Sequence, residues 1–306
     1  MYQDATAPVT LGARPPAPNP GAVPLRPSSN PEGRSIGSII QEAHKLSAEQ
    51  VERVLSHQRQ HGTMFGESAI ALGLIRHDDV MWALSQQFQY PTALTRALDR
   101  ELVSAARPFS PQAEVFRSLR SQVVMRLASY GQPQPAIAVV SAEPGDGKTF
   151  VAANLAIAFS QLGGRTLLLD ADMRSPRQHK LFGVDNATGL SHILSGRETT
   201  RVVHPVAELP SLYVLPVGTL APNPLELVER PAFALLLHDL QAKFDHIVVD
   251  TPAASHGADG SVIAARCGAA LVVARAGRSH LRSLEGLMAF LRAGPAHIVG
   301  AMLNEH

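Results

Sequence analysis

The sequence predicts an α/β fold with a mainly parallel sheet covered by helices on both faces, preceded by a small all-helical repeat domain. Three observations support this fold class. Short apolar runs alternate with amphipathic segments from about residue 135, a glycine-rich loop follows the first run, and residues 34–93 contain an internal repeat. The length of 306 residues suits about two domains. The net charge of +1 gives no strong field, so we expect no nucleic-acid partner.

Residues 1–33 are rich in Pro, Gly, Ala, Ser and Asn and poor in large apolar residues. Such a composition cannot bury enough surface to offset its ordering entropy, so we expect a disordered arm. The arm lacks the features of a secretion signal, and no segment of the chain reaches the roughly 18 apolar residues of a membrane span. The single cysteine, Cys267, cannot form an internal disulfide. We therefore expect a cytoplasmic protein that meets any membrane through a partner.

Residues 34–93 are predicted to form a helical module of two copies, offset by 29 residues, in which Leu46 matches Ile75. Each copy has the pattern of a short helix, a turn and a second helix. The second helices begin at capping signals, residues 47–50 and 76–79. Apolar residues recur at i, i+3 and i+4 spacing, so each copy has one face that it can bury against the other.

A glycine opens each copy, Gly37 in the first and Gly66 in the second, and is followed by an apolar pair and a closing glutamine. This pattern resembles the N-terminal module of type II secretion and pilus-extension ATPases, some of which bind cyclic di-GMP. Where the binding version has an arginine, this sequence has Ser35 and Met64. Because arginine is suited to hold phosphate and stack on guanine, a module that only packs stays an open alternative to one that binds cyclic di-GMP.

Residues 94–133 are predicted to be a helical connector. Within it, Glu114, Arg117 and Arg120 are spaced by three residues, which places them along one side of a helix. An exposed, salt-bridged helix face is one interpretation of this spacing.

Residues 134–306 are predicted to form the α/β domain, because short apolar runs here alternate with amphipathic segments. Nearly continuous apolar runs are typical of strands that are buried on both faces of a parallel sheet. The expected strands are residues 136–141, 166–171, 212–216, 246–251, 269–275 and 297–303. The clearest helices between them are residues 148–161, 231–243 and 279–292.

The strongest chemical signal is the glycine-rich loop of residues 142–149, which lies between the first strand and a helix. Its glycines let the backbone curl so that N–H groups point at phosphate oxygens, and the helix N-terminus adds positive potential. Lys148 would reach the β- and γ-phosphates, and the Thr149 hydroxyl would bind Mg²⁺. The sequence therefore predicts a P-loop NTPase that uses ATP and Mg²⁺. The expected nucleotide-binding residues are Gly145, Asp146, Gly147, Lys148, Thr149 and Phe150.

Carboxylates end two of the expected strands. Asp170 and Asp172 follow the run that starts at residue 166, and Asp250 follows the run that starts at residue 246. Each of them alone could be a turn former or a helix cap. Ligands of open α/β sheets bind beyond the carboxyl ends of the strands, so all three should lie beside the P-loop. Carboxylates next to a triphosphate need a cation to offset their negative charge, and Mg²⁺ with retained waters is the usual one.

The sequence Leu-Leu-Leu-Asp170-Ala-Asp172-Met-Arg174 resembles the second Walker A motif of bacterial tyrosine kinases, the BY-kinases. Residues 135–304 resemble their catalytic domain, and the chain is similar to the chain-length-determinant tyrosine kinases of exopolysaccharide biosynthesis. The resemblance implies that Lys148, Asp170 and Asp172 are catalytic, with Asp170 orienting or deprotonating the tyrosine hydroxyl. It also implies that Thr149, Asp172 and Asp250 hold Mg²⁺ directly or through water.

The same resemblance implies partners. Members of this family act with a membrane-anchored chain-length-determinant (polysaccharide co-polymerase) protein, which would place this chain at the inner membrane. Glu114, Arg117 and Arg120 resemble the motif through which these kinases assemble into homo-oligomeric rings. Asn304 stands where related ATPases have an asparagine that contacts adenine.

Two alternatives stay open. The first is a positioning ATPase of the MinD/ParA type, although Glu143 occupies the place of that group's signature lysine. The second is an ATP-gated regulatory scaffold of an exporter, with little kinase activity. The familiar kinases phosphorylate a tyrosine-rich tail, whereas this sequence ends at His306. Its tyrosines, which leave the acceptor undefined, are Tyr2, Tyr90, Tyr130 and Tyr213.

Overall fold

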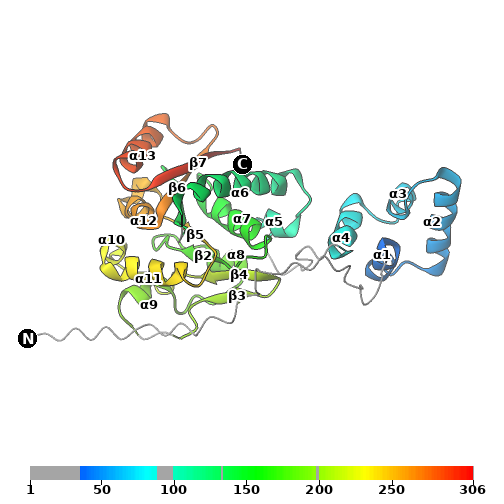
Figure 1. The fold of residues 1–306 in the computed structure, drawn as a ribbon, viewed down its shortest axis with the longest axis horizontal. Coiled ribbons are helices and arrows are strands. Elements are labelled where there is room, and N and C mark those ends of the chain that lie inside the picture. Colours follow the sequence, from blue (N-terminus) through cyan, green and yellow to red (C-terminus); the bar gives the residue numbers. More distant parts are fainter. Residues whose placement is uncertain (1–34, 88–98, 132–133, 198–199, 306) are drawn as a thin grey trace, which may run out of the picture. The chain divides into compact units, whose positions relative to one another are not determined.

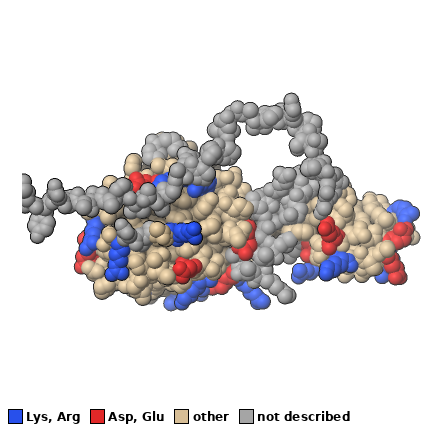
Figure 2. Space-filling view, turned by 90° about the horizontal axis from the view of Figure 1, so that it is seen from below, with Lys and Arg blue, Asp and Glu red and all other residues tan. Residues whose placement is uncertain are grey.

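The computed structural model describes residues 35–87, 99–131, 134–197 and 200–305 (Figure 1). The predicted arm of residues 1–33, and with it Tyr2, lies outside the described residues, as does Tyr90. The described chain forms two compact units, a helical unit of residues 35–87 and an α/β unit of residues 99–305. Basic and acidic side chains are both scattered over the described surface in view in Figure 2. Among the described residues, every helix is too short or too polar to cross a bilayer.

The helical unit has the two-copy architecture that the repeat predicts. Its helices are α1 (Ile36–His44), α2 (Ala48–His61), α3 (Phe65–Ala71) and α4 (His77–Gln87) (Figure 1). Six buried apolar residues form the described core, and they fall into three pairs that are 29 residues apart. These pairs are Ile40 with Ala69, Leu46 with Ile75, and Val54 with Ala83. Equivalent positions of the two copies therefore build one shared core.

Close packing explains the glycine that opens each copy. A Cβ atom on Gly66 would lie 2.9 Å from a methyl carbon of Val80, and one on Gly37 would lie 3.4 Å from the Phe65 ring. The positions of the missing arginines serve as helix N-caps. Ser35 caps α1 through its side chain, and Met64 precedes α3 with 73% of its surface exposed.

The α/β unit is built on a seven-stranded sheet of order β3-β4-β2-β5-β1-β6-β7. All neighbouring strands are parallel except β3 and β4. The six predicted strands are present, and β3 is an additional antiparallel strand that contains Pro205. The strands are β1 (Ala136–Ser141), β2 (Thr166–Asp170), β3 (His204–Val206), β4 (Leu209–Leu215), β5 (His246–Asp250), β6 (Gly268–Arg275) and β7 (His297–Asn304).

Helices cover both faces of this sheet, which confirms the predicted fold class (Figure 1). Leu167 and Leu169 of β2 face the core on the side of α9–α13, and the buried Leu168 between them points to the opposite face, where α7 lies. The helices are α5 (Val103–Ala106), α6 (Pro111–Leu127), α7 (Lys148–Ser160), α8 (Gln178–Phe182), α9 (Leu190–Leu194), α10 (Pro224–Glu229), α11 (Pro231–Gln241), α12 (Asp259–Cys267) and α13 (Leu281–Ala293). Two short 3₁₀ helices are η1 (Ala128–Tyr130) and η2 (Ala254–His256).

The segment predicted as a connector packs as part of the α/β unit. Helices α5 and α6 lie against α7, and polar side chains in and just after α7 hold the segment of α5 there. The buried Asn154 accepts a hydrogen bond from the Ser104 N–H (2.9 Å) and donates one to the Glu101 carbonyl (2.9 Å). Gln161 donates to the Ser104 carbonyl (3.0 Å). Helix α7 is therefore enclosed between the sheet and these helices, which explains why it is apolar on nearly all sides.

Candidate active site

The P-loop joins β1 to α7 and requires glycine at two positions. Gly145 and Gly147 have φ angles of +83° and +97°, in the left-handed region that favours glycine. A Cβ atom on Gly147 would also overlap the side-chain nitrogen of Asn304. These conformations aim the loop into a cavity of about 500 Å³.

Side chains from the C-terminal part of the α/β unit, between the end of β6 and the end of β7, hold the P-loop in place. The buried Asp146 accepts hydrogen bonds from the Glu143 N–H (3.0 Å) and the Ser279 hydroxyl (2.7 Å). Arg275 donates to the Gly145 carbonyl (3.1 Å), and Asn304 donates to the Asp146 carbonyl (3.2 Å). The structure thus places Asn304 directly against the phosphate loop, and its predicted contact with adenine stays a prediction.

Lys148 at the start of α7 and Asp172 in the loop after β2 both line the cavity. The Lys148 Nζ lies 3.8 Å from Asp172 Oδ2, and both residues are buried. The other oxygen of Asp172 accepts hydrogen bonds from the N–H groups of Arg174 (3.2 Å) and Ser175 (2.9 Å). These bonds fix the loop after β2 so that a carboxylate oxygen is left facing the lysine.

Asp170 lies beneath the cavity rather than on its wall. It is 0% exposed, and its Oδ1 accepts a hydrogen bond from the Asp172 N–H (3.2 Å). Its Oδ2 accepts from the N–H groups of Arg177 (3.1 Å) and Gln178 (3.0 Å). Burial raises the pKa of Asp170, and the neighbouring charge of Asp250 raises it further. In this geometry Asp170 shapes the backbone that carries Asp172.

Asp250 ends β5 and is also fully buried. Its Oδ2 accepts a hydrogen bond from the Gln178 side chain (2.9 Å), which also donates to the Thr149 carbonyl (3.0 Å). Its Oδ1 has no hydrogen-bond partner among the described residues. Burial raises the pKa of Asp250 to about 6, although the Lys148 ammonium opposes that rise. A buried carboxylate oxygen without a partner is a free acceptor for a cation or its water.

The residues present suit Mg²⁺ together with a nucleotide better than a metal bound by protein alone. Across the described residues, no group of three His, Cys, Asp or Glu side chains is arranged to hold a metal ion. Mg²⁺ usually takes one or two carboxylates and completes its shell with phosphate oxygens and waters. Thr149, Asp172 and the free oxygen of Asp250 meet that requirement beside the P-loop.

The rim of the cavity is formed by residues that the sequence patterns did not identify. Arg177 pairs with Glu101, and both line the cavity with Arg275 and His256. These residues come from different loops, so no spacing along the sequence connects them. Gln178, which bridges α7 to β5, was missed for the same reason.

Glu143 occupies the place of the lysine of positioning ATPases and has partners at the start of α13. Its Oε1 lies 2.7 Å from the His280 Nδ1 and accepts a hydrogen bond from the Ser283 hydroxyl (3.0 Å). These contacts, His280 first, lower the pKa of Glu143. Glu143 therefore ties the P-loop to α13 within one chain.

The three residues of the predicted ring motif lie on α6. Arg117 bonds Glu114 (2.7 Å) and the Pro108 carbonyl (2.5 Å), and Arg120 donates to the Ala158 carbonyl at the end of α7 (2.8 Å). Both arginines thus have partners within the chain. The Glu114 side chain stays 62% exposed.

Curated relatives carry tyrosine-kinase names. The tyrosine-protein kinase ptk of Acinetobacter johnsonii is 34% identical over 193 residues, which are 63% of this chain and 26% of that protein. CapB of Staphylococcus aureus, also named as a tyrosine-protein kinase, is 31% identical over 202 residues, or 65% of this chain and 86% of CapB. The chain thus spans about a quarter of the length of ptk but most of the length of CapB.

Solved structures give the same result. The kinase domain of the Escherichia coli tyrosine kinase ETK superposes with a TM-score of 0.62 at 30% identity, covering 66% of this chain and 79% of that one. The chimerical protein CapA2B2 superposes with a TM-score of 0.63 at 29% identity, covering 73% and 97%. The family described as "ParA: NUBPL iron-transfer P-loop NTPase" matches residues 132–292. The chain therefore belongs to the family of bacterial tyrosine-protein kinases and carries a P-loop NTPase domain of the ParA type.

Proposed function

We propose that this chain is an ATP-dependent protein-tyrosine kinase. The observation that carries the proposal is that Lys148, Thr149 and Asp172 line the P-loop cavity and that Asp250 is buried beside them at the same edge of the sheet. In the reaction, a tyrosine oxygen attacks the γ-phosphorus, the bond to the bridging oxygen breaks, and ADP leaves. The hydroxyl proton goes to a carboxylate. Such a transfer needs chiefly positioning and charge neutralisation.

Each residue has a defined task in this proposal. Lys148 neutralises the transferring phosphoryl group, and Thr149, Asp172 and Asp250 hold Mg²⁺, which when bound neutralises phosphate charge. The P-loop N–H groups orient the triphosphate. The raised pKa of Asp170 suits a proton acceptor. In the described geometry Asp170 positions Asp172, and it takes the hydroxyl proton only after its Oδ2 releases the N–H groups of Arg177 and Gln178.

Phosphopeptide mapping after incubation with Mg-ATP tests the proposal. Wild type should form phosphotyrosine, and Lys148→Met should lose on the order of 10²–10³-fold of the rate. Lys180→Met is the matched control, because Lys180 is exposed on α8 and does not line the cavity. Binding of ATP without any phosphotyrosine in the wild type would exclude the kinase and favour an ATP-gated scaffold.

The physiological setting is a further part of the proposal. We expect the kinase to regulate exopolysaccharide polymerisation, chain length and export, at the inner membrane and through a membrane-anchored chain-length-determinant partner. The resemblance of residues 135–304 to kinases of such systems supports this. A cytoplasmic tail from such a partner, added to the assay, should raise the rate of phosphotyrosine formation. An unchanged rate and no complex in co-purification would contradict the partner.

Ring assembly rests on Glu114, the exposed member of its motif. A charge-reversing Glu114→Arg should lower the mass of the assembly measured by mass photometry, and Glu49→Arg on α2 is the control at an exposed acidic position.

Cyclic di-GMP binding at the helical unit is a separate proposal. Its expected place is the surface cavity lined by Leu55, Gln58, Arg59, Gly62 and Thr63. A calorimetric titration in which Arg59→Ala binds as wild type does would contradict that location.

A further inference from the structure

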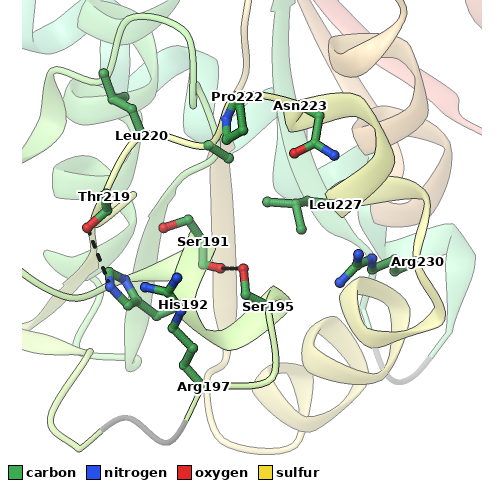
Figure 3. Close-up of a pocket in the computed structure, with 11 residues that line it drawn as sticks. Ser191, His192, Ser195, Arg197, Thr219, Leu220, Pro222, Asn223, Leu227 and Arg230 are labelled. Atoms are coloured by element: carbon green, nitrogen blue, oxygen red, sulfur yellow. Dashed lines mark hydrogen bonds between the residues drawn. The ribbon is translucent and has the colours of Figure 1, made fainter.

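The α/β unit has a second cavity, of about 360 Å³, at the carboxyl end of β4. It lies between α9, α10 and the loop of residues 219–223 (Figure 3). Among the described residues, none lines both this cavity and the nucleotide cavity. The proposed reaction makes no use of it. Both cavities nevertheless open beyond the carboxyl ends of strands of the same sheet, the edge where ligands of such sheets bind.

The walls of this second cavity are fixed by hydrogen bonds. The Leu190 N–H donates to the Pro216 carbonyl (2.9 Å), which holds the start of α9 at the end of β4. The Asn186 side chain accepts from the Gly218 N–H (2.8 Å) and donates to the Gly218 carbonyl (3.3 Å). The cavity is therefore formed before any ligand enters it.

Its charge is positive. The 11 lining residues include Arg197 and Arg230 and no Asp or Glu. Within the described chain, the Arg197 side chain makes no hydrogen bond or ion pair, and the Arg230 side chain makes only a 3.4 Å hydrogen bond to the Leu194 carbonyl. Figure 3 shows the two guanidinium groups coming from different segments, Arg197 after α9 and Arg230 between α10 and α11. Two guanidinium groups without acidic partners make the cavity attractive to a doubly charged anion such as phosphate.

Part of the cavity lining is apolar. Leu220, Pro222 and Leu227 line the side formed by the 219–223 loop and α10 (Figure 3). Leu220 is 58% exposed, which is high for a leucine at a cavity mouth. Inorganic phosphate or phosphoserine would leave this wall uncovered, whereas an aromatic ring would bury it.

We propose that this cavity binds a phosphotyrosine side chain, with the phosphate on Arg197 and Arg230 and the ring against Leu220, Pro222 and Leu227. The inference rests on the proposed function, because phosphotyrosine is the product of that reaction. Arginine clusters are a recurrent means of recognising phosphorylated peptides. Bound here, a phosphorylated segment is held at the edge of the sheet where the transfer takes place.

Fluorescence anisotropy on the full chain tests the inference, with a labelled peptide Gly-Ser-Tyr-Ser-Gly in phosphotyrosine, phosphoserine and unmodified tyrosine forms. The phosphotyrosine form should bind about tenfold or more tightly than the other two. Arg197→Gln and Arg230→Gln should each weaken it about tenfold, and Arg292→Gln, at an exposed site on α13, should not. Arg197 is exposed and unpaired in the described structure, so its variant keeps the fold even if Arg230→Gln does not.

The outcomes of this experiment test the phosphotyrosine site independently of the proposed kinase function. Peptide binding needs no ATP and should persist in Lys148→Met, so it is measurable even if no kinase activity exists. Equal affinity for phosphoserine, or full competition by inorganic phosphate at the peptide's own affinity, overturns the phosphotyrosine class. Binding that both arginine variants leave unchanged places the peptide elsewhere and also overturns the inference. Kinase activity without any peptide binding refutes only this second site.

Discussion

The helical unit and the nucleotide edge of the α/β unit are stabilised in different ways. In the helical unit the described core consists of apolar side chains, and ion pairs such as Arg59–Glu52 lie on the surface with their side chains 69% and 70% exposed. At the nucleotide edge, charged groups such as Lys148, Asp170 and Asp250 are buried. Buried charge opposes folding unless it is fully paired, whereas exposed ion pairs contribute little. Core substitutions in the helical unit should therefore change its stability and leave nucleotide binding unchanged, and substitutions at the nucleotide edge should change function and stability separately.

The largest expected effect is on nucleotide binding, at Gly147 of the P-loop, where a side chain has no room. Gly147→Ala places a Cβ against Asn304 at a φ of +97°, so the loop must shift. We expect nucleotide affinity, measured with a fluorescent ATP analogue and Mg²⁺, to fall on the order of 10²–10³-fold. The melting of the helical unit should not change.

Gly163→Ala is the matched control for that variant. Gly163 also has a left-handed φ, of +88°, but nothing lies within 4 Å of its Cβ position. We expect a loss of about 1–2 kcal/mol in the free energy of unfolding and unchanged nucleotide affinity. Equal losses of affinity in the two variants would show that strain elsewhere in the α/β unit lowers the affinity as much as the contact with Asn304 does.

The second prediction concerns the pH dependence of the metal-free chain in EDTA. The folded-state pKa of Asp250 is raised to about 6 from an ordinary 3.8, so the folded chain binds this proton more tightly than the unfolded chain. Stability is then lost as the pH rises from about 4 through 6. Asp250→Asn should remove this loss and unfold with a free energy on the order of 2–3 kcal/mol higher than wild type at pH 8. The difference should vanish near pH 4.

Thermal and urea unfolding between pH 4 and pH 8 measure this difference. Asp239→Asn on the exposed side of α11 is the control for removal of a surface carboxylate. The same Asp250→Asn variant should lose Mg²⁺-dependent turnover, so function and stability move in opposite directions. A variant less stable than wild type at pH 8 would mean that hydrogen bonds to Asp250 outweigh the burial of its charge.

The contrast between the units also explains which features were predictable. Continuous apolar runs and a glycine-rich loop are local signals, so the six parallel strands, the P-loop and the position of Asp172 at the sheet edge followed from the sequence. The 29-residue repeat likewise predicted Leu46 and Ile75 as equivalent positions, and both lie in the core of the helical unit. Local patterns were sufficient to predict a feature wherever a single segment of the sequence contains the whole pattern.

Contacts between distant segments were not predictable in this way. Gln178 and Asp250 are 72 residues apart, and Ser279 and Asp146 are 133 apart, yet both pairs form hydrogen bonds in the site. Polar residues in loops have no periodicity that could reveal such partners. The docking of α5 on α7 was missed because Asn154 and Gln161, which hold α5, look like ordinary helix residues. Strand β3 is too short, at three residues with a proline, to show a strand pattern.

A core substitution in the helical unit gives the third, smaller effect. Val54 is 0% exposed, so Val54→Ala should lower the stability of the helical unit by about 2 kcal/mol. Hydrogen exchange of peptides from residues 36–87 should show faster exchange, with no change in peptides from α7 or in nucleotide affinity. Val115→Ala is the matched control, since Val115 is 51% exposed on α6. A fall in nucleotide affinity in Val54→Ala would break the comparison, because the two units would then be coupled.

The smallest effect compares the two repeat copies at equivalent helix starts. Ser47 and Gln50 form both bonds of a capping box, at 3.2 and 2.8 Å. In the second copy the Arg76 N–H donates to Asp79 (2.8 Å), but the arginine side chain cannot accept a bond in return. We therefore expect Ser47→Ala to destabilise the helical unit by about 1 kcal/mol and Arg76→Ser to stabilise it by a similar or smaller amount.

Hydrogen exchange at the first turns of α2 and α4 separates these two variants on the same chain. Ser47→Ala should speed exchange in the first turn of α2, and Arg76→Ser should slow it in the first turn of α4. The salt bridge lost with Arg76 has little weight, because its Nε is 3.8 Å from Asp79 and its side chain is 83% exposed. If Arg76→Ser instead destabilised α4, that exposed pair would be stronger than its geometry implies. The surface charges of the helical unit would then stabilise it, whereas the buried charge of Asp250 at the nucleotide edge opposes folding.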